Sequence, residues 1–104
     1  MPTPNRGEVW ITDLGMAAKV RPCLVLNVAL EAVDRVLTTL IPLTTATYGT
    51  RFEIAVLAPF IKAGVFDTQQ IITIPNVKLI RRLGTLPADQ LKLVEAGVRA
   101  WLGL

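Results

Sequence analysis

The segment KVRPCLVLNV, residues 19–28, combines two cations and a proline with a nearly unbroken apolar run. Such a run over Pro22 to Val28 predicts a buried strand. Cys23 is expected to be a small core side chain, and as the only cysteine of the chain it cannot form an intramolecular disulfide. Lys19 and Arg21 therefore lie at the beginning of a buried strand, a position where charged side chains are not expected without a function.

The sequence on both sides predicts four further strands, at residues 8–13, 36–43, 51–57 and 70–74. Apolar and polar residues alternate in the first and third of these, and β-branched residues are frequent in the second. In the first strand, Val9 and Ile11 are expected on one face and Trp10 and Thr12 on the other. Residues 15–20, 31–35 and 44–50 are predicted to be loops or turns because glycine, aspartate or polar side chains gather there.

In the C-terminal part, the spacing of apolar residues changes from the period of a strand to that of a helix. Residues 77–84, VKLIRRLG, predict a short helical turn closed by glycine. From Pro87, which suits the first helical position, apolar residues recur at helical spacing on one face: Leu91, Val94, Val98, Trp101 and Leu102. Gly97 costs a helix ~1 kcal/mol relative to alanine, so it is expected to permit close packing. The order predicts a mainly β chain with a C-terminal helix (α+β), built as a small, partly open β-barrel.

Length and composition favour one globular domain over residues 1–104 that assembles with a partner. The chain is 52% hydrophobic and only 18% charged, so some apolar surface is expected in an interface, and we predict a homodimer. No apolar run approaches the ~18–20 residues that span a bilayer, and the first residues lack a secretory signal, so a cytoplasmic protein is expected. The net charge of +3 favours polyanions only mildly.

The order of these pieces resembles a known family. RGEVWITDLG, RPCLVLN, IPLTT and QQIITI…KLIRRLGTLPADQL…WLGL follow one another from Arg6 to Leu104 as in the MazF/PemK toxins of type II toxin–antitoxin systems. The resemblance implies an SH3-like (CcdB-like) barrel and a homodimer. It also implies an mRNA interferase, an endoribonuclease that cleaves single-stranded RNA sequence-selectively without metal or cofactor and is neutralised by a cognate antitoxin. The antitoxin is expected to be a small acidic protein, because the RNA-binding groove is mildly basic.

By the same resemblance, Arg21 before the proline and Thr44 after the third strand are catalytic. Attack of a ribose 2′-hydroxyl passes through a phosphorane with extra negative charge and leaves a cyclic phosphate. A planar guanidinium can hold two phosphate oxygens, and a hydroxyl can donate to a third. Pro22 restrains the backbone next to Arg21. The competing interpretation is a surface arginine at a strand end.

Six further residues are candidates for binding RNA: Trp10, Lys19, Thr45, Asp67, Gln69 and Gln70. Trp10 suits stacking on a base or packing in the barrel, and Lys19 suits a phosphate contact or a solvated loop. Thr45, Gln69 and Gln70 can read base edges or merely line a loop. Asp67 is a candidate general base or a loop cap. Arg81 and Arg82 are expected to be a solvated pair at a helix end.

The chain departs from the family pattern at three positions. Met16 stands where many relatives have a glutamate, and Gln69 and Ile72 replace an acidic and a basic residue. The sequence contains no histidine, so the usual imidazole acid–base pair is absent and no general base is assigned. No close carboxylate cluster appears in the sequence, so no metal site is predicted.

Two other functions stay open at this point. CcdB-like toxins share the barrel and poison DNA gyrase by a protein contact, and the ending AWLGL, residues 100–104, is similar to theirs. Trp101 also continues the apolar stripe of the helix, which explains it by packing. The second alternative is a barrel that binds RNA at Arg21 and its neighbours without cutting it.

Overall fold

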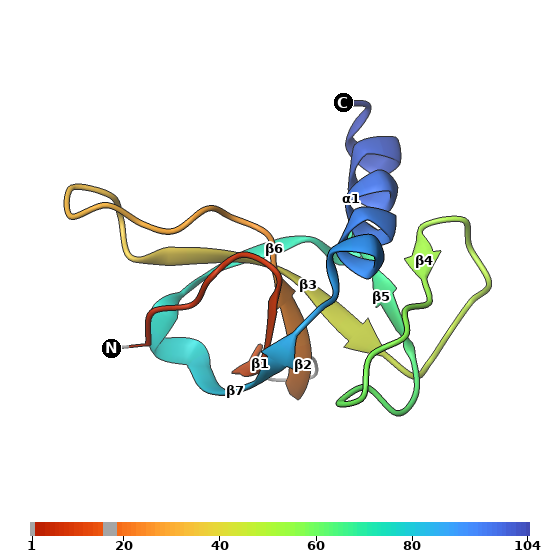
Figure 1. Ribbon diagram of the computed structural model, residues 1–104, viewed down its shortest axis with the longest axis horizontal. Coiled ribbons are helices and arrows are strands. Elements are labelled where there is room, and N and C mark those ends of the chain that lie inside the picture. The colour runs from red at the N-terminus through yellow and green to blue at the C-terminus, as the bar shows by residue number, and fades with distance from the viewer. Residues whose placement is uncertain (1, 16–18) are drawn as a thin grey trace.

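The computed structural model describes residues 2–15 and 19–104, which form a strongly curved antiparallel sheet and one helix (Figure 1). The strands are β1 (Glu8–Asp13), β2 (Val20–Val25), β3 (Leu37–Thr44), β4 (Glu53–Ile54), β5 (Val65–Asp67), β6 (Ile72–Pro75) and β7 (Leu79–Thr85). Two 3₁₀ turns, η2 (Thr68–Gln70) and η3 (Asn76–Lys78), precede β6 and β7, and α1 (Ala88–Leu102) ends the fold. The prediction of a mainly β, barrel-like chain with a C-terminal helix is confirmed.

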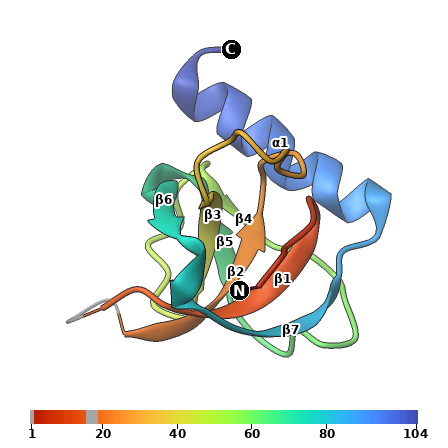
Figure 2. The ribbon, with the colours of Figure 1, turned by 90° about the vertical axis from the view of Figure 1, so that its left-hand side faces the viewer.

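The curvature comes from β3, the longest strand. Its first half pairs with β6, its middle with β2 and its last two residues with β5, and the strands run in the order β4-β5-β3-β2-β1-β7. One strand thus links two parts of the sheet that face in different directions. Figure 2 shows α1 lying across one side of this curved sheet.

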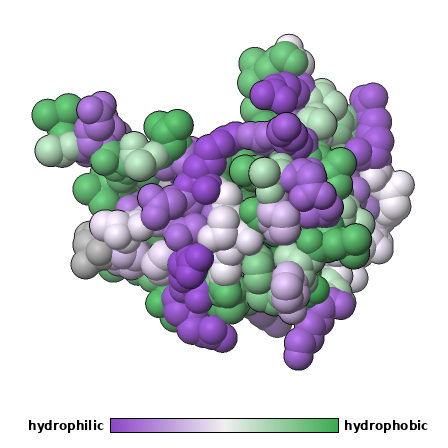
Figure 3. Space-filling view, in the orientation of Figure 1, coloured by the Kyte–Doolittle hydropathy of each residue, from purple (hydrophilic) through white to green (hydrophobic). Residues whose placement is uncertain are grey.

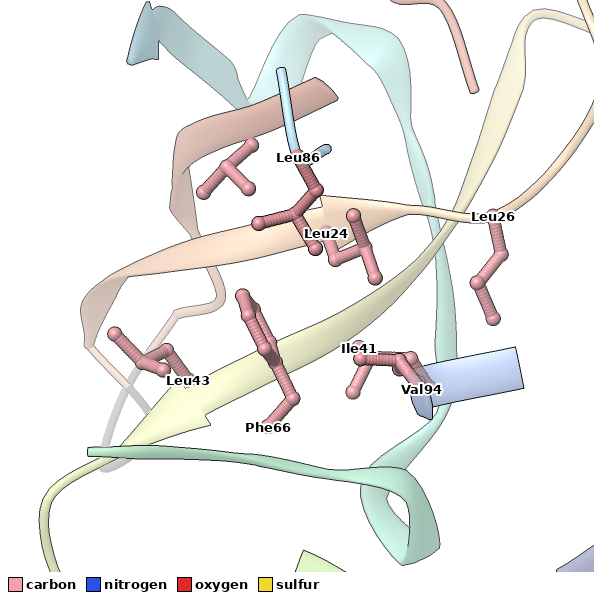
Figure 4. Packing of buried hydrophobic residues seen from close by; sticks show 8 residues of the cluster. Leu24, Leu26, Ile41, Leu43, Phe66, Leu86 and Val94 are labelled. Carbon is pink, nitrogen blue, oxygen red and sulfur yellow. The ribbon is translucent and has the colours of Figure 1, made fainter. Parts of the chain in front are cut away.

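The buried strand predicted around Cys23 is confirmed, and it divides two apolar clusters. Leu24 and Leu26 pack into the larger cluster with Phe66 and Val94 (Figure 4). Cys23 and Val25 point the other way, toward a smaller cluster with Leu40, Ile74 and Leu79. Both faces of β2 are therefore covered, which is why its sequence is apolar at consecutive positions rather than at alternate ones.

The C-terminal helix begins one residue later than expected, because Pro87 is the N-cap and not the first helical residue. Val94 is fully buried and Leu91 and Val98 pack beside it, as the apolar stripe predicts. The close packing expected at Gly97 is also found. A Cβ there would lie 3.0 Å from side-chain atoms of both Ile54 and Thr68.

The helical turn predicted for residues 77–84 is wrong. Residues 79–85 form β7, which pairs with the outer edge of β1 through Trp10–Arg82 and Ile11–Arg81. Pairing with a neighbouring strand outweighs the weak local preference for a helix. Gly84 closes no helix. It makes room for a ring, because a Cβ there would lie 2.5 Å from Phe60.

Three smaller differences between the predicted and observed strands concern β4, β5 and β1. The strand predicted at 51–57 shortens to the two residues of β4, and β5, which the sequence does not predict, pairs with it. In β1 burial does not alternate, since Thr12 is fully buried while Ile11 is only partly buried. Trp10 and Thr12 nevertheless share a face, as predicted, because Trp10 packs against the cluster of Cys23 and Thr12 hydrogen-bonds with Cys23. The β1–β7 ladder shifts register between Ile11 and Thr12, whereas the β1–β2 ladder runs through both residues without a shift.

Exposed apolar side chains gather on the connection between β2 and β3. This segment projects from the sheet (Figure 1) and carries the exposed residues Val28, Leu30, Val33 and Val36. Figure 3 shows the same projection with much apolar surface, and more at the free end of α1. Both patches fit the expectation of a partner interface. Among the described residues, no helix has the length and apolar character needed to cross a membrane.

Candidate active site

A pocket of about 450 Å³ lies where β2 begins and β3 ends. It is lined by Lys19, Val20, Arg21, Pro22, Leu43, Thr44, Thr45, Ala46, Lys62 and Ala63, and we call it the cationic pocket. The two strands are antiparallel, with Cys23 opposite Pro42. Continuing that register by two residues brings Arg21 and Thr44 to the same place, although 22 residues separate them in the sequence.

Thr44 is almost fully buried, at 8% exposure, yet its side chain borders the pocket. Its Oγ1 accepts a hydrogen bond of 3.1 Å from the backbone N–H of Ala46. A hydroxyl has one proton to donate besides its acceptor lone pairs, so this contact orients the oxygen and leaves its proton for another acceptor.

Gly64 packs closely against the backbone of Thr44. It has φ +104°, and a Cβ at this position would lie 2.6 Å from the carbonyl oxygen of Thr44. The next residue, Val65, pairs with Thr44 in the β3–β5 ladder. Only glycine allows this approach, so Gly64 is a positioning residue for Thr44.

The pocket collects positive charge. Lys19, Arg21 and Lys62 line it, and none of the described residues that line it is acidic. Arg21 is half-buried, and its carbonyl accepts a hydrogen bond of 3.6 Å from the Sγ of Cys23. Lys19 has φ 58°, held by the bonds that its N–H and carbonyl make with Gly15 and Leu14. Three cations and two hydroxyls facing one space suit a phosphate group.

The structure thus brings together four of the residues predicted from the sequence: Lys19, Arg21, Thr44 and Thr45. The other four lie outside the pocket lining. Asp67 is buried and its carboxylate accepts from the N–H of Gln69 at 3.1 Å, which caps η2. Gln69 and Gln70 are exposed on η2. Trp10 is half-buried and donates from its ring nitrogen to Glu8 at 3.1 Å. Met16 lies outside the described residues.

Arg82 is not part of a solvated helix end but of an ion pair on the sheet. Its Nε lies 2.8 Å from a carboxylate oxygen of Glu8. Burial alone raises the pKa of Glu8, but hydrogen bonds from Asn5 and Trp10 and the charge of Arg82 outweigh it and lower that pKa overall. This contact joins β7 to β1, so it is structural.

The sequence does not predict Lys62, which lines the pocket, or Gly64, which packs against the backbone of Thr44. Lys62 belongs to a loop without strand or helix periodicity, and no motif marks it. Gly64 directly precedes the apolar pair Val65 and Phe66, and an isolated glycine at such a place is a signal of close backbone approach.

Comparison with known proteins agrees with this architecture. A family model described as PemK-like, MazF-like toxin of type II toxin-antitoxin system matches residues 5–102. The MazF structure from Deinococcus radiodurans is 25% identical with a TM-score of 0.82, and both chains are covered completely. Toxin MazF-mt6 from Mycobacterium tuberculosis is 26% identical with a TM-score of 0.76, covering 93% of this chain and 97% of its own.

An endoribonuclease from a mycobacterial species, solved in complex with its cognate antitoxin, has the same fold. It is 22% identical with a TM-score of 0.83, and the match covers 97% of this chain and 96% of that one. No curated protein matches the chain. The family model covers nearly all of the sequence, and the resemblance seen in the sequence is confirmed: the chain belongs to the PemK-like, MazF-like toxins of type II toxin–antitoxin systems.

Proposed function

We propose that this toxin is a metal-independent endoribonuclease that cleaves single-stranded RNA sequence-selectively and is neutralised by a cognate antitoxin. The observation that carries the proposal is the meeting of Arg21 and Thr44 in one pocket with Lys19 and Lys62. These groups supply charge and hydrogen-bond donors for a phosphate from the protein itself. Relatives of the same fold are named endoribonucleases, which supports the reaction class.

The reaction begins with attack of a ribose 2′-oxygen on the adjacent phosphorus. The new O2′–P bond forms as the P–O5′ bond breaks, leaving a 2′,3′-cyclic phosphate and a 5′-hydroxyl. The 2′-hydroxyl proton passes to water, and the departing 5′-oxygen takes a proton from water. Arg21 holds two phosphate oxygens as negative charge grows, and the Thr44 hydroxyl donates to a third. Lys19 and Lys62 hold the flanking backbone as point charges. The arginine acts mainly by stabilising charge, since its pKa above ~12 makes it a poor proton donor.

The proposal includes two assemblies. A homodimer would cover apolar side chains that are exposed in the single chain, notably Val28, Val33 and Leu104, which are 73%, 94% and 84% exposed. An acidic antitoxin segment would neutralise the cationic pocket and fold as it binds. Solved relatives include MazE–MazF complexes from Deinococcus radiodurans, which supports an antitoxin as the partner.

The test is incubation of the purified protein with a long RNA in excess EDTA. We expect internal cuts at a short recurring sequence, with fragments whose 3′ ends accept a poly(A) tail only after the terminal phosphate is removed. Arg21→Ala, purified in parallel, controls for a contaminating nuclease and should give no such fragments.

Three outcomes separate the alternatives. Cuts that appear only with added magnesium would refute metal independence. RNA binding without cuts would favour the non-catalytic barrel. If the protein neither cuts nor binds RNA but inhibits gyrase, the CcdB-like function would be favoured. The partly exposed Trp101 is the relevant residue for that function.

A further inference from the structure

The loop that follows Thr44 carries an unusually exposed aromatic residue. Tyr48 is 85% exposed, whereas the other aromatic side chain near this loop, Phe52, is buried. The residues around Tyr48 from Thr45 to Thr50 are exposed and are small or polar. Tyr48 is therefore the only large apolar side chain of residues 45–50.

The loop is held in place by one carboxylate. Glu53 accepts hydrogen bonds from three consecutive backbone N–H groups, those of Tyr48 at 2.9 Å, Gly49 at 2.6 Å and Thr50 at 3.0 Å. These bonds lower the pKa of Glu53. Gly49 supplies the φ of +76° that the turn requires. The backbone of Tyr48 is thus fixed before any ligand arrives, and an aromatic group on a fixed backbone loses little entropy when it binds.

The loop also lies beside the cationic pocket. Ala46 lines that pocket, and Tyr48 is only two residues further along. Two residues of extended chain span at most about 7 Å, so the backbone of Tyr48 lies within that distance of Ala46. A nucleotide next to the one held by Arg21 and Thr44 is within its reach.

We infer that Tyr48 stacks on a nucleobase next to the cleaved phosphate and contributes to the choice of RNA sequence. This inference rests on the proposed ribonuclease function and adds a specificity residue to it. Single-stranded RNA offers unstacked bases, and an exposed, rigidly mounted ring is the usual platform for them. An antitoxin contact is the alternative, but the polar surroundings of the ring favour a base over an apolar protein face.

The experiment uses a short RNA that contains the mapped cleavage sequence, with a 2′-deoxy sugar at the cut position so that binding occurs without reaction. The fluorescent base 2-aminopurine replaces each neighbouring base in turn. We expect the wild-type protein to quench it at one position. Tyr48→Phe should keep the quenching, whereas Tyr48→Leu should lose it and bind roughly 5- to 150-fold more weakly, the loss expected for one stacked base. Thr47→Ala, at an exposed loop residue outside the pocket lining, is the matched control and should behave as wild type.

Cleavage of a randomised RNA pool supplies the second readout. Tyr48→Leu should relax the preference at a single position, leaving the others unchanged. Normal binding, quenching and preference in Tyr48→Leu would overturn the inference but leave the ribonuclease proposal intact. Normal RNA readouts with lost antitoxin affinity would assign Tyr48 to the protein partner instead. If the wild type neither binds nor cuts RNA, both proposals fail.

Discussion

Replacing Gly64 by alanine tests whether the backbone next to the cationic pocket positions Thr44. The added Cβ would lie 2.6 Å from the carbonyl oxygen of Thr44 and 3.2 Å from its carbonyl carbon. Both are backbone atoms of β3, so no side chain can rotate away to relieve the contact. The residue also has φ +104°, which is unfavourable for any L side chain.

Two costs add up in this variant. The unfavourable φ contributes about 1–3 kcal/mol, and the steric overlap about the same again. We therefore expect the free energy of unfolding to fall by about 4 kcal/mol. At roughly 4 °C per kcal/mol for a chain of this length, the Tm should fall by about 16 °C.

The matched control is Gly103→Ala. Gly103 has φ +72° in the C-cap of α1, and no atom lies within 4 Å of its Cβ position. It carries only the conformational cost, about 1–2 kcal/mol. Chemical denaturation compares the two variants, and single-turnover RNA cleavage well below the lower Tm compares their activity. Gly64→Ala should cleave more slowly than Gly103→Ala, because Thr44 must shift. Equal stability and equal cleavage in the two variants would refute the positioning role of Gly64.

Five further variants, at three positions, test the site and the core. Arg21→Lys keeps the charge but loses the planar guanidinium, so the rate of single-turnover cleavage should fall ~10²–10³-fold. The rate should fall further in Arg21→Ala, and the Tm of both variants should be unchanged. Near-normal cleavage by Arg21→Ala would refute a catalytic role for Arg21. Thr44→Ala should slow cleavage, while Thr44→Ser, which keeps the hydroxyl acceptor for the N–H of Ala46, should retain most of the wild-type rate. Equal cleavage rates in these two variants would contradict a role for the hydroxyl. Burial raises the pKa of Cys23 from 9.0 to about 11. The unfolded thiol therefore loses its proton first, and stability, complete below pH 9, should fall by up to about 1.4 kcal/mol per pH unit between pH 9 and 11. In chemical denaturation, the free energy of unfolding of Cys23→Ala should fall less steeply than that of the wild type across that pH range. Identical pH slopes for the two proteins would contradict the shifted pKa.

Local sequence determined the elements whose side-chain pattern is strong. The apolar run after Pro22 required a strand covered on both faces, and α1 followed from the helical spacing of Leu91, Val94 and Val98. Arg21 and Thr44, which the family motifs mark as catalytic candidates, both line the cationic pocket.

Only the tertiary structure decided how the weaker segments fold. Residues 79–85 form a strand because the outer edge of β1 offers hydrogen bonds to them, which no local pattern records. Thr12 is buried beside Cys23 of β2, again a property of the pair of strands and not of β1 alone.

The same reason explains residues in and beside the pocket that the sequence does not predict. Lys62 lines the pocket and Gly64 packs against Thr44 because β5 pairs with the end of β3. The backbone of Tyr48 is fixed because Glu53 accepts hydrogen bonds from three N–H groups. Periodicity reports how a residue relates to its near neighbours in the chain. The charge and shape of the cationic pocket depend instead on contacts between strands that lie far apart in the sequence, so they exist only once the sheet has closed.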